Sequence, residues 1–190
     1  MLSHVIKTTT APLHARLEQA LFANAIMDGS LTLSDYNKVL RVNYYVHHLL
    51  EPLIFIALGE RVKQEIELVK RTKLPALEED MIGSRINLFA DGHISVHLPS
   101  FDNEAEALGA LYVLEGATLG GQVIIKQLKK NDSFATLPLA YYNVYANKTG
   151  VRWKQFLEII NQYEDRERVL QGAQKVYELY LAVAEVVKRS

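Results

Sequence analysis

The sequence contains no cysteine. Without thiols the chain cannot form disulfide bonds, thiolate metal sites or the covalent cofactor attachment of a CxxCH motif. The absence fits a reducing compartment, so we expect a cytoplasmic protein.

An excess of one charge and long apolar runs are also missing. Lysine and arginine together number 21 against 22 aspartates and glutamates, so the formal net charge is -1. Such a chain has no global field that would attract nucleic acid or an anionic membrane. The N-terminal segment lacks the apolar core of a signal peptide, and the longest apolar run, LIFIALG, is too short to span a bilayer. We therefore expect neither a nucleic-acid partner nor a membrane partner.

The apolar content is ample and follows a helical period. Hydrophobic residues make up 49% of the 190 residues, which is enough for one packed core. Alternating strand patterns are not found, so we predict an all-α protein, a compact single-domain bundle of about six to nine helices over residues 1–190. The expected helices cover residues 3–22, 32–58, 61–72, 75–89, 104–130, 151–163 and 166–188, with a loop over residues 90–103.

Caps and prolines refine these boundaries. Pro12 either follows a cap at Thr10 or marks a break in the first helix. Thr32 is expected to cap the second helix, and Pro52 to bend or interrupt it. Asn103 is expected to cap the helix that begins at residue 104.

The stretch LEGATLGGQ places Gly116, Gly120 and Gly121 inside an apolar helical pattern. Each glycine in a helix costs about 0.8 to 1 kcal/mol relative to alanine, so the three together give up about 2 to 3 kcal/mol. Gly116 and Gly120 would share one face, and Gly121 permits a distortion beside it. Either another helix packs closely there or a large flat ligand lies under a kinked backbone. The spacing matches neither a P-loop nor a dinucleotide fingerprint.

The histidines indicate a single candidate for metal ligation. No HExxH pair occurs among the six histidines. His14 precedes Glu18 by one helical step, so the carboxylate could hold one imidazole nitrogen and leave the other to bind iron. A lone helical histidine is more often an ordinary surface or core residue. His93 and His97 are expected to be loop residues without a catalytic role.

Two motifs in this order resemble the haem oxygenases, and in particular the compact bacterial branch associated with phytochrome chromophore synthesis. IKTTTAPLHARLEQALF is similar to the proximal-helix segment of that family, and GALYVLEGATLGGQVIIKQL is similar to its distal helix. YNKVLRVNYYVHHLLEPL and TGVRWKQF extend the resemblance over most of the chain. The resemblance implies a haem-oxygenase-type helical bundle with a kinked distal helix.

The resemblance also assigns roles to single residues. His14 matches the proximal iron ligand and Glu18 the acidic residue that orients it. Gly116, Gly120 and Gly121 match the distal glycines that approach the haem. Residues expected around the haem are Lys7 and Lys154 near the propionates, His47 in place of a distal tyrosine, and Tyr112 either at the pocket border or in the core.

In this family haem is both cofactor and substrate. Electrons from an external reductant, a ferredoxin or a flavoprotein reductase, and O₂ open the porphyrin at a meso carbon to biliverdin, with release of CO and Fe²⁺. A histidine ligand suits this chemistry better than a thiolate, which favours O–O cleavage. A phytochrome is one candidate acceptor of the biliverdin.

Two residues depart from the family pattern. Ala117 replaces the distal aspartate of the animal enzymes, and Glu158 stands where an arginine near a propionate is expected. The first departure keeps open an alternative function, a haem-binding or sensing protein with little turnover. A haem-free helical protein that shares only the architecture is a further alternative.

Overall fold

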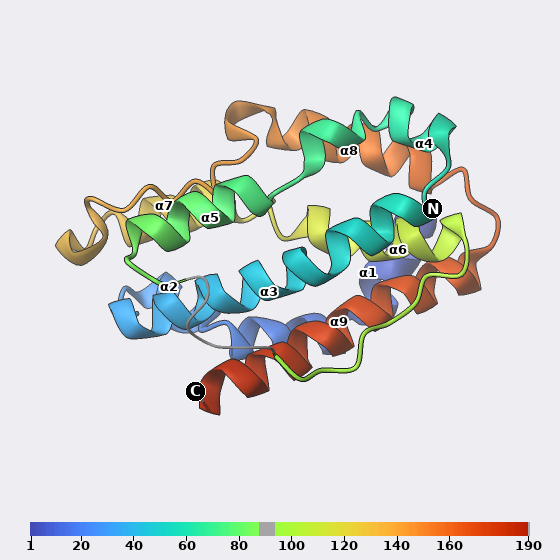
Figure 1. Cartoon of the computed structure of the whole chain (residues 1–190). Coiled ribbons are helices and arrows are strands. Elements are labelled where there is room, and N and C mark those ends of the chain that lie inside the picture. The colour runs from blue at the N-terminus through green and yellow to red at the C-terminus, as the bar shows by residue number, and fades with distance from the viewer. Residues whose placement is uncertain (88–93, 190) are drawn as a thin grey trace.

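The computed structural model describes residues 1–87 and 94–189 and is all-α there, as predicted. The chain order is visible in Figure 1, where α3 and α9 lie in front of α1 and α6. The α-helices are α1 (Leu2–Ala20), α2 (Ala23–Asp28), α3 (Leu33–Ala57), α4 (Glu60–Glu65), α5 (Leu74–Gly83), α6 (Glu104–Gly116), α7 (Gly121–Leu128), α8 (Thr149–Ile160) and α9 (Arg166–Arg189), and the 3₁₀ turns are η1 (Leu68–Arg71), η2 (Asp132–Phe134) and η3 (Ala146–Lys148).

The core forms where α6 crosses α9, with α3 packed against both helices and α1 packed against α9. Glycines allow the α6–α9 crossing to be very close. A Cβ added to Gly109 would lie 1.8 Å from the Val169 carbonyl oxygen, and one added to Gly172 would lie 1.9 Å from that of Glu106. The helix backbones therefore touch directly at this crossing, which fixes α6 in the centre of the molecule.

Pro12 behaves differently from both sequence expectations. It lies inside a continuous α1, so it neither follows a cap nor breaks the helix. Thr10 is buried and its hydroxyl donates to the Ile6 carbonyl oxygen at 2.8 Å, so the expected cap at Thr10 is wrong. The hydroxyl is used within the helix rather than at its start.

The other expected boundaries are confirmed at the caps and shifted elsewhere. Thr32 accepts from the Asp35 N–H at 3.1 Å, and Asn103 accepts from the Glu106 N–H at 3.0 Å. α3 continues through Pro52 without interruption. The short α2 was not predicted, and the expected helix 61–72 divides into α4 and η1. α5 ends at residue 83, before the expected end at residue 89. Residues 88–93, which include His93 and part of the expected loop, lie outside the described residues.

The expected helix 104–130 is broken in the middle. α6 ends at Gly116 and α7 begins at Gly121, and residues 117–120 form turns between them. Thr118 N–H donates to the Glu115 carbonyl oxygen at 3.1 Å, and Gly121 N–H donates to that of Thr118 at 3.1 Å. The distal helix is therefore kinked, as the family resemblance implies.

The same run corrects the expectation about apolar length. By length and composition alone, Glu104–Leu128 could cross a membrane, since an 18-residue window within it has a mean hydropathy of 1.4. More than half of that window, 56%, is buried inside the fold. A buried core helix passes the same test as a membrane span, so the run is explained by its packing on α9.

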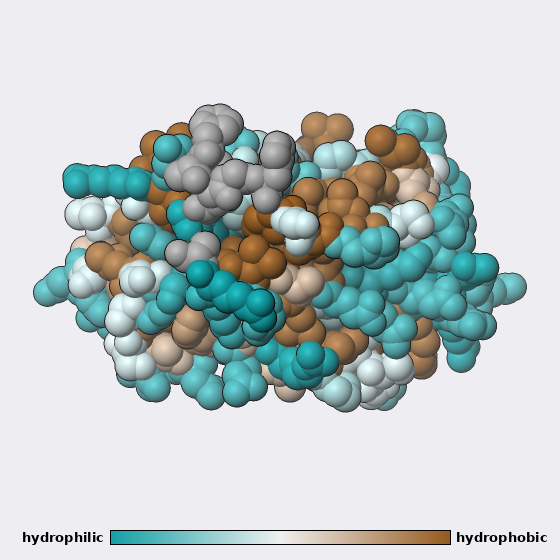
Figure 2. All heavy atoms as spheres, turned by 60° about the horizontal axis from the view of Figure 1, so that its bottom comes forward, coloured by the Kyte–Doolittle hydropathy of each residue, from teal (hydrophilic) through white to brown (hydrophobic). Residues whose placement is uncertain are grey.

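The face at the bottom of Figure 1 carries polar side chains with apolar residues gathered near its middle, as Figure 2 shows. The segment before α6 contributes Ile94, Val96 and Phe101, which are partly buried against the main core cluster. These residues therefore belong to the edge of the core.

Candidate functional site

His14 and Glu18 lie on an open face of α1. Both side chains are 57% exposed, and His14 Nδ1 is 3.4 Å from a Glu18 carboxylate oxygen. The edge of the His14 ring meets Tyr177 on α9, with 6.3 Å between ring centroids. Because Nδ1 faces Glu18, Nε2 is the ring nitrogen that remains for a further ligand.

The three glycines at the break fall into two groups. Gly121 is buried, and a Cβ there would lie 2.2 Å from the Tyr142 carbonyl oxygen, so close backbone packing explains this glycine. A Cβ on Gly116 would meet nothing closer than 3.8 Å, and one on Gly120 nothing closer than 3.7 Å. Those two distances are ordinary contacts. No described protein neighbour therefore requires glycine at 116 or 120, and neither residue has a positive φ.

Aromatic contacts lie beside each of the two regions. Tyr112 and Trp153 have ring centroids 5.1 Å apart, and Trp153 on α8 is the residue nearest to a Cβ on Gly116. Tyr112 is buried, and so is Tyr177, the ring partner of His14, where burial raises the pKa of Tyr177 to about 12. Trp153 also packs beside Phe156, in agreement with its expected role as a packing residue.

α2 lies near the same region, because it contacts both α1 and α7, the helix that begins just beyond the break. A hollow of about 410 Å³ lies between α1 and α2 and is lined by Ala15, Glu18, Gln19, Ala23, Asn24 and Met27. Ligand sites usually have about 300 to 1,000 Å³, so this hollow could hold part of a large planar molecule. It includes Glu18 but reaches neither His14 nor Gly120.

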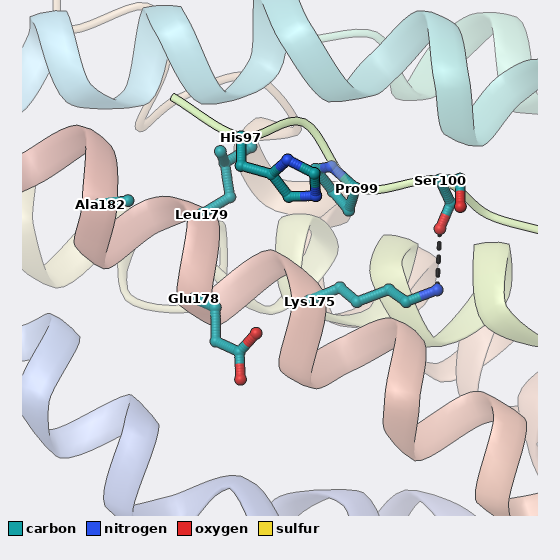
Figure 3. Close-up of a pocket in the computed structure, with 7 residues that line it drawn as sticks. All are labelled: His97, Pro99, Ser100, Lys175, Glu178, Leu179 and Ala182. Atoms are coloured by element: carbon teal, nitrogen blue, oxygen red, sulfur yellow. Dashed lines mark hydrogen bonds between the residues drawn. The ribbon is translucent and has the colours of Figure 1, made fainter. Parts of the chain in front are cut away.

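A second hollow lies elsewhere, between α9 and the segment before α6. Its volume is about 420 Å³. Figure 3 shows the residues that line it, which are His97, Pro99, Ser100, Lys175, Glu178, Leu179 and Ala182. Lys175 Nζ donates to the Ser100 carbonyl oxygen at 2.8 Å and to Glu106 at 2.6 Å. Its charge is already used by the protein, so the hollow offers little to an anionic ligand.

His47 is fully buried on α3, away from solvent. Its Nδ1 lies 2.8 Å from a Glu51 oxygen and its Nε2 lies 3.3 Å from the Tyr141 hydroxyl. Burial lowers the pKa of His47, and the hydrogen bond to Glu51 opposes that shift only in part. His47 is therefore a neutral imidazole whose two ring nitrogens both have polar partners. Its neighbour His48 is exposed and stacks on Tyr44.

The remaining expected residues are at the surface. Lys7 on α1 and Lys154 on α8 are exposed and lie on helices that contact each other. Ala117 is exposed within the break, and Glu158 is exposed on α8. Their exposure leaves them available to a ligand at the edge of the site.

A buried ion cluster beneath the break was not expected from the sequence. The charge run RVKQEIELVKR suggests a solvated helix face, but Arg71 is fully buried, so that expectation is wrong at its end. Arg71 and Lys73 both donate to the Glu115 carboxylate, which is 1% exposed. The single acidic residue in the apolar run YVLEGAT was the available signal, because an acid there needs a cationic partner.

The described residues thus define an all-α protein with an exposed histidine on its first helix, a glycine break in a central helix, and an aromatic pair, Tyr112 and Trp153, beside that break. The chain belongs to the haem oxygenase family, since the family model described as "Heme oxygenase" matches residues 1–186. It is also similar to a protein named "Heme oxygenase" from Xanthomonas campestris pv. campestris (strain 8004), with 31% identity over 94 residues. That match covers 48% of this chain and 52% of the relative, so it spans about half the length of each.

Proposed function

We propose that this protein is a haem oxygenase whose haem is both substrate and cofactor. It opens the porphyrin with O₂ and electrons to biliverdin and releases CO and Fe²⁺. The observation that carries the proposal is that Gly116 and Gly120 stand at the break where no described neighbour requires glycine, since an added Cβ would make only ordinary contacts at 3.8 and 3.7 Å. Glycine at these two positions is accounted for when a bulky planar ligand lies against their backbone.

His14 supplies the proximal ligand in this proposal, and a bound haem supplies the iron that activates O₂. The carboxylate of Glu18 lies 3.4 Å from His14 Nδ1, so it would favour a proton on that nitrogen and leave Nε2 for iron. Tyr112 and Trp153 border the pocket and exclude water from its inner side. Gly116, Ala117 and Gly120 keep the distal side free of large side chains.

The outer parts of the site hold the polar edge of the haem. Lys7 and Lys154 attract the propionates from α1 and α8, and the exposed Glu158 repels a propionate that comes near it. Gly121 secures the break by packing on Tyr142. His47 acts from behind the distal side through its contacts with Glu51 and Tyr141.

The wider setting follows from the same chemistry. An external reductant, either a ferredoxin or a flavoprotein reductase, supplies electrons at the exposed haem edge. The family branch proposed is the biliverdin-producing bacterial one, in which a phytochrome receives the product. We propose a single domain over residues 1–190 that works in the cytoplasm, without nucleic-acid or membrane partners.

A haem-binding or sensing protein is the second candidate, and Ala117 favours it. The methyl group of Ala117 cannot accept or donate a hydrogen bond, so it cannot hold a distal water as an aspartate would. This candidate shares the binding site and differs only in turnover.

Hemin titration followed by turnover separates the candidates. The Soret band of wild-type protein is expected to saturate with hemin, and His14→Ala should lose at least about tenfold in affinity because the iron loses its protein ligand. His4→Ala is the matched control, since His4 is also exposed on α1. Addition of ascorbate or ferredoxin with its reductase under air should then give biliverdin and CO. Stable haem absorption would support the sensor, and lack of saturable binding would overturn both candidates.

A further inference from the structure

The ion cluster beneath the break consists of Glu115, Arg71, Lys73 and Tyr145, and we call it the Glu115 cluster. Arg71 Nη1 donates to one carboxylate oxygen of Glu115, and Lys73 Nζ donates to the other. The Tyr145 hydroxyl donates to the Lys73-bound oxygen at 2.8 Å. Burial opposes ionisation of Glu115, but the charges of Lys73 and Arg71 outweigh burial and lower its pKa.

The cations of the Glu115 cluster connect the end of α6 to distant parts of the chain. Arg71 Nε donates to the Ile66 carbonyl oxygen at 2.6 Å, and its Nη2 donates to the Arg152 carbonyl oxygen on α8 at 3.2 Å. The Lys73 backbone N–H donates at 2.8 Å to Glu51 on α3. The last turn of α6 is therefore held against α3, α8 and the segment that contains η1.

Stability alone does not account for this arrangement. An acidic side chain in the last turn of a helix is disfavoured by the helix dipole. Removing two opposite charges from water costs several kcal/mol per ion, and apolar side chains of similar size often stabilise a buried site as well or better. A buried pair instead fixes one geometry, because its hydrogen bonds have defined directions.

Glu115 is also the residue on which the break is built. Its carbonyl oxygen accepts from the Thr118 hydroxyl at 2.7 Å, in addition to the Thr118 N–H. Gly116 follows it directly. Displacement of Glu115 therefore displaces the turn that carries Ala117 and Gly120.

We propose that Glu115 is a positioning residue that sets where the break lies over the haem, and thereby which meso carbon of the porphyrin is opened. The proposal rests on the proposed function. Glu115 does not touch the ligand in this view, and acts through the backbone of residues 116–120. Arg71 and Lys73 hold it in one place.

The chain contains a matched control in Glu106, at the other end of α6. Glu106 is also 1% exposed and also accepts from two cations, Arg168 at 2.8 Å and Lys175 at 2.6 Å. It lies beside the α6–α9 crossing, about two and a half helical turns before Glu115. Glu106→Gln therefore removes a shielded carboxylate from the same helix without disturbing the break, although its partners Arg168 and Lys175 are 48% and 29% exposed whereas Arg71 and Lys73 are buried.

The first measurement is hydrogen–deuterium exchange of the protein without haem. Glu115→Gln is expected to speed amide exchange in peptides that cover residues 117–121 by about tenfold, because the turn loses its fixed support. Glu106→Gln should leave those peptides unchanged. Equal exchange in wild type and Glu115→Gln, or equal acceleration by Glu106→Gln, would overturn the positioning role.

The second measurement is the isomer composition of the biliverdin formed with hemin, ascorbate and air. Glu115→Gln is expected to bind hemin within about threefold of wild type but to give a mixture of isomers, at a rate lowered about tenfold, since misplacement of about 1 Å can cost more than that. Glu106→Gln should give the wild-type isomer. An unchanged isomer pattern in folded Glu115→Gln would contradict the proposal.

Two further variants keep the test open if Glu115→Gln does not fold. The double variant Lys73→Met with Glu115→Gln removes one charge of each sign, and Tyr145→Phe removes one hydrogen bond to Glu115 while both cations stay. Both are judged by the same two measurements. If wild-type protein does not open haem, the proposed function fails, and the exchange experiment still decides whether Glu115 fixes the break.

Discussion

The N-terminal half of α6 and the break after its last turn use glycine for opposite purposes. In the N-terminal half, Gly109 packs so closely on α9 that an added Cβ would overlap the Val169 carbonyl oxygen at 1.8 Å. At the C-terminal end, Gly116 and Gly120 face space in which a Cβ would fit. The difference teaches that a glycine-rich stretch must be interpreted residue by residue, because backbone packing requires glycine at position 109 and no described neighbour requires it at 116 or 120.

The buried carboxylates follow the same division. Glu106 joins α6 to α9 beside the close crossing, and Glu115 joins α6 to three other segments beside the break. The N-terminal half of α6 is fixed by packing on α9, and its C-terminal end is fixed by hydrogen bonds beside the candidate site.

The largest expected effect tests the packed end. Gly109→Ala places a Cβ 1.8 Å from the Val169 carbonyl oxygen, so α6 and α9 must separate. We expect a loss of about 3 kcal/mol in the free energy of unfolding, typical of severe overpacking. Urea denaturation of the haem-free protein measures it. A loss below about 0.5 kcal/mol would show that the crossing is looser than described.

The next effect tests the open end. Gly120→Leu is expected to change the free energy of unfolding by less than about 1 kcal/mol, because the position is exposed. Its side chain should enter the space above the haem and lower O₂-dependent turnover at least about tenfold. Hemin titration and CO release measure the two effects. Full turnover would remove the steric role assigned to Gly120.

A smaller effect concerns how the free energy of unfolding depends on pH through the buried His47. Burial lowers the pKa of His47 below its usual 6.5, so the unfolded chain takes up a proton first as the pH falls. The contribution of neutral His47 to the free energy of unfolding should therefore be complete above pH 6.5. It should decline below that pH, by at most about 1.4 kcal/mol per pH unit. Denaturation at several pH values measures the slope. His47→Gln should flatten it, and an equal slope in that variant would assign the proton elsewhere.

The smallest effect completes the comparison of glycines. Gly120→Ala adds a Cβ whose nearest neighbour is 3.7 Å away, at a φ of -78° that alanine readily adopts. We expect a change within about 0.5 kcal/mol, on the stabilising side, because alanine restricts the unfolded chain. Thermal unfolding beside Gly109→Ala shows the contrast. Destabilisation equal to that of Gly109→Ala would mean that both ends are packed.

The sequence predicted the helices where local signals are strong. Thr32 and Asn103 cap as expected, because a side-chain oxygen placed before an apolar period has few other uses. Pro12 misled the interpretation, since α1 packs on α9 strongly enough to continue through a proline. Tertiary packing decides such cases, and local pattern does not contain it.

The candidate site was predicted in part. His14 and Glu18 are one helical step apart, so their contact at 3.4 Å follows from spacing alone. The separate explanation of Gly121 required the position of Tyr142, which lies far along the chain. The need of Glu115 for a cation could be inferred from its apolar run, but its partners could not, because Arg71 and Lys73 come from a segment whose charges look solvated in sequence.

The most direct test of the account is a crystal structure of the protein loaded with hemin. We predict iron bound to His14 Nε2, with the macrocycle lying between α1 and the backbone of residues 116–120. Iron bound by another histidine, or a porphyrin seated in the hollow beside Lys175, would contradict it.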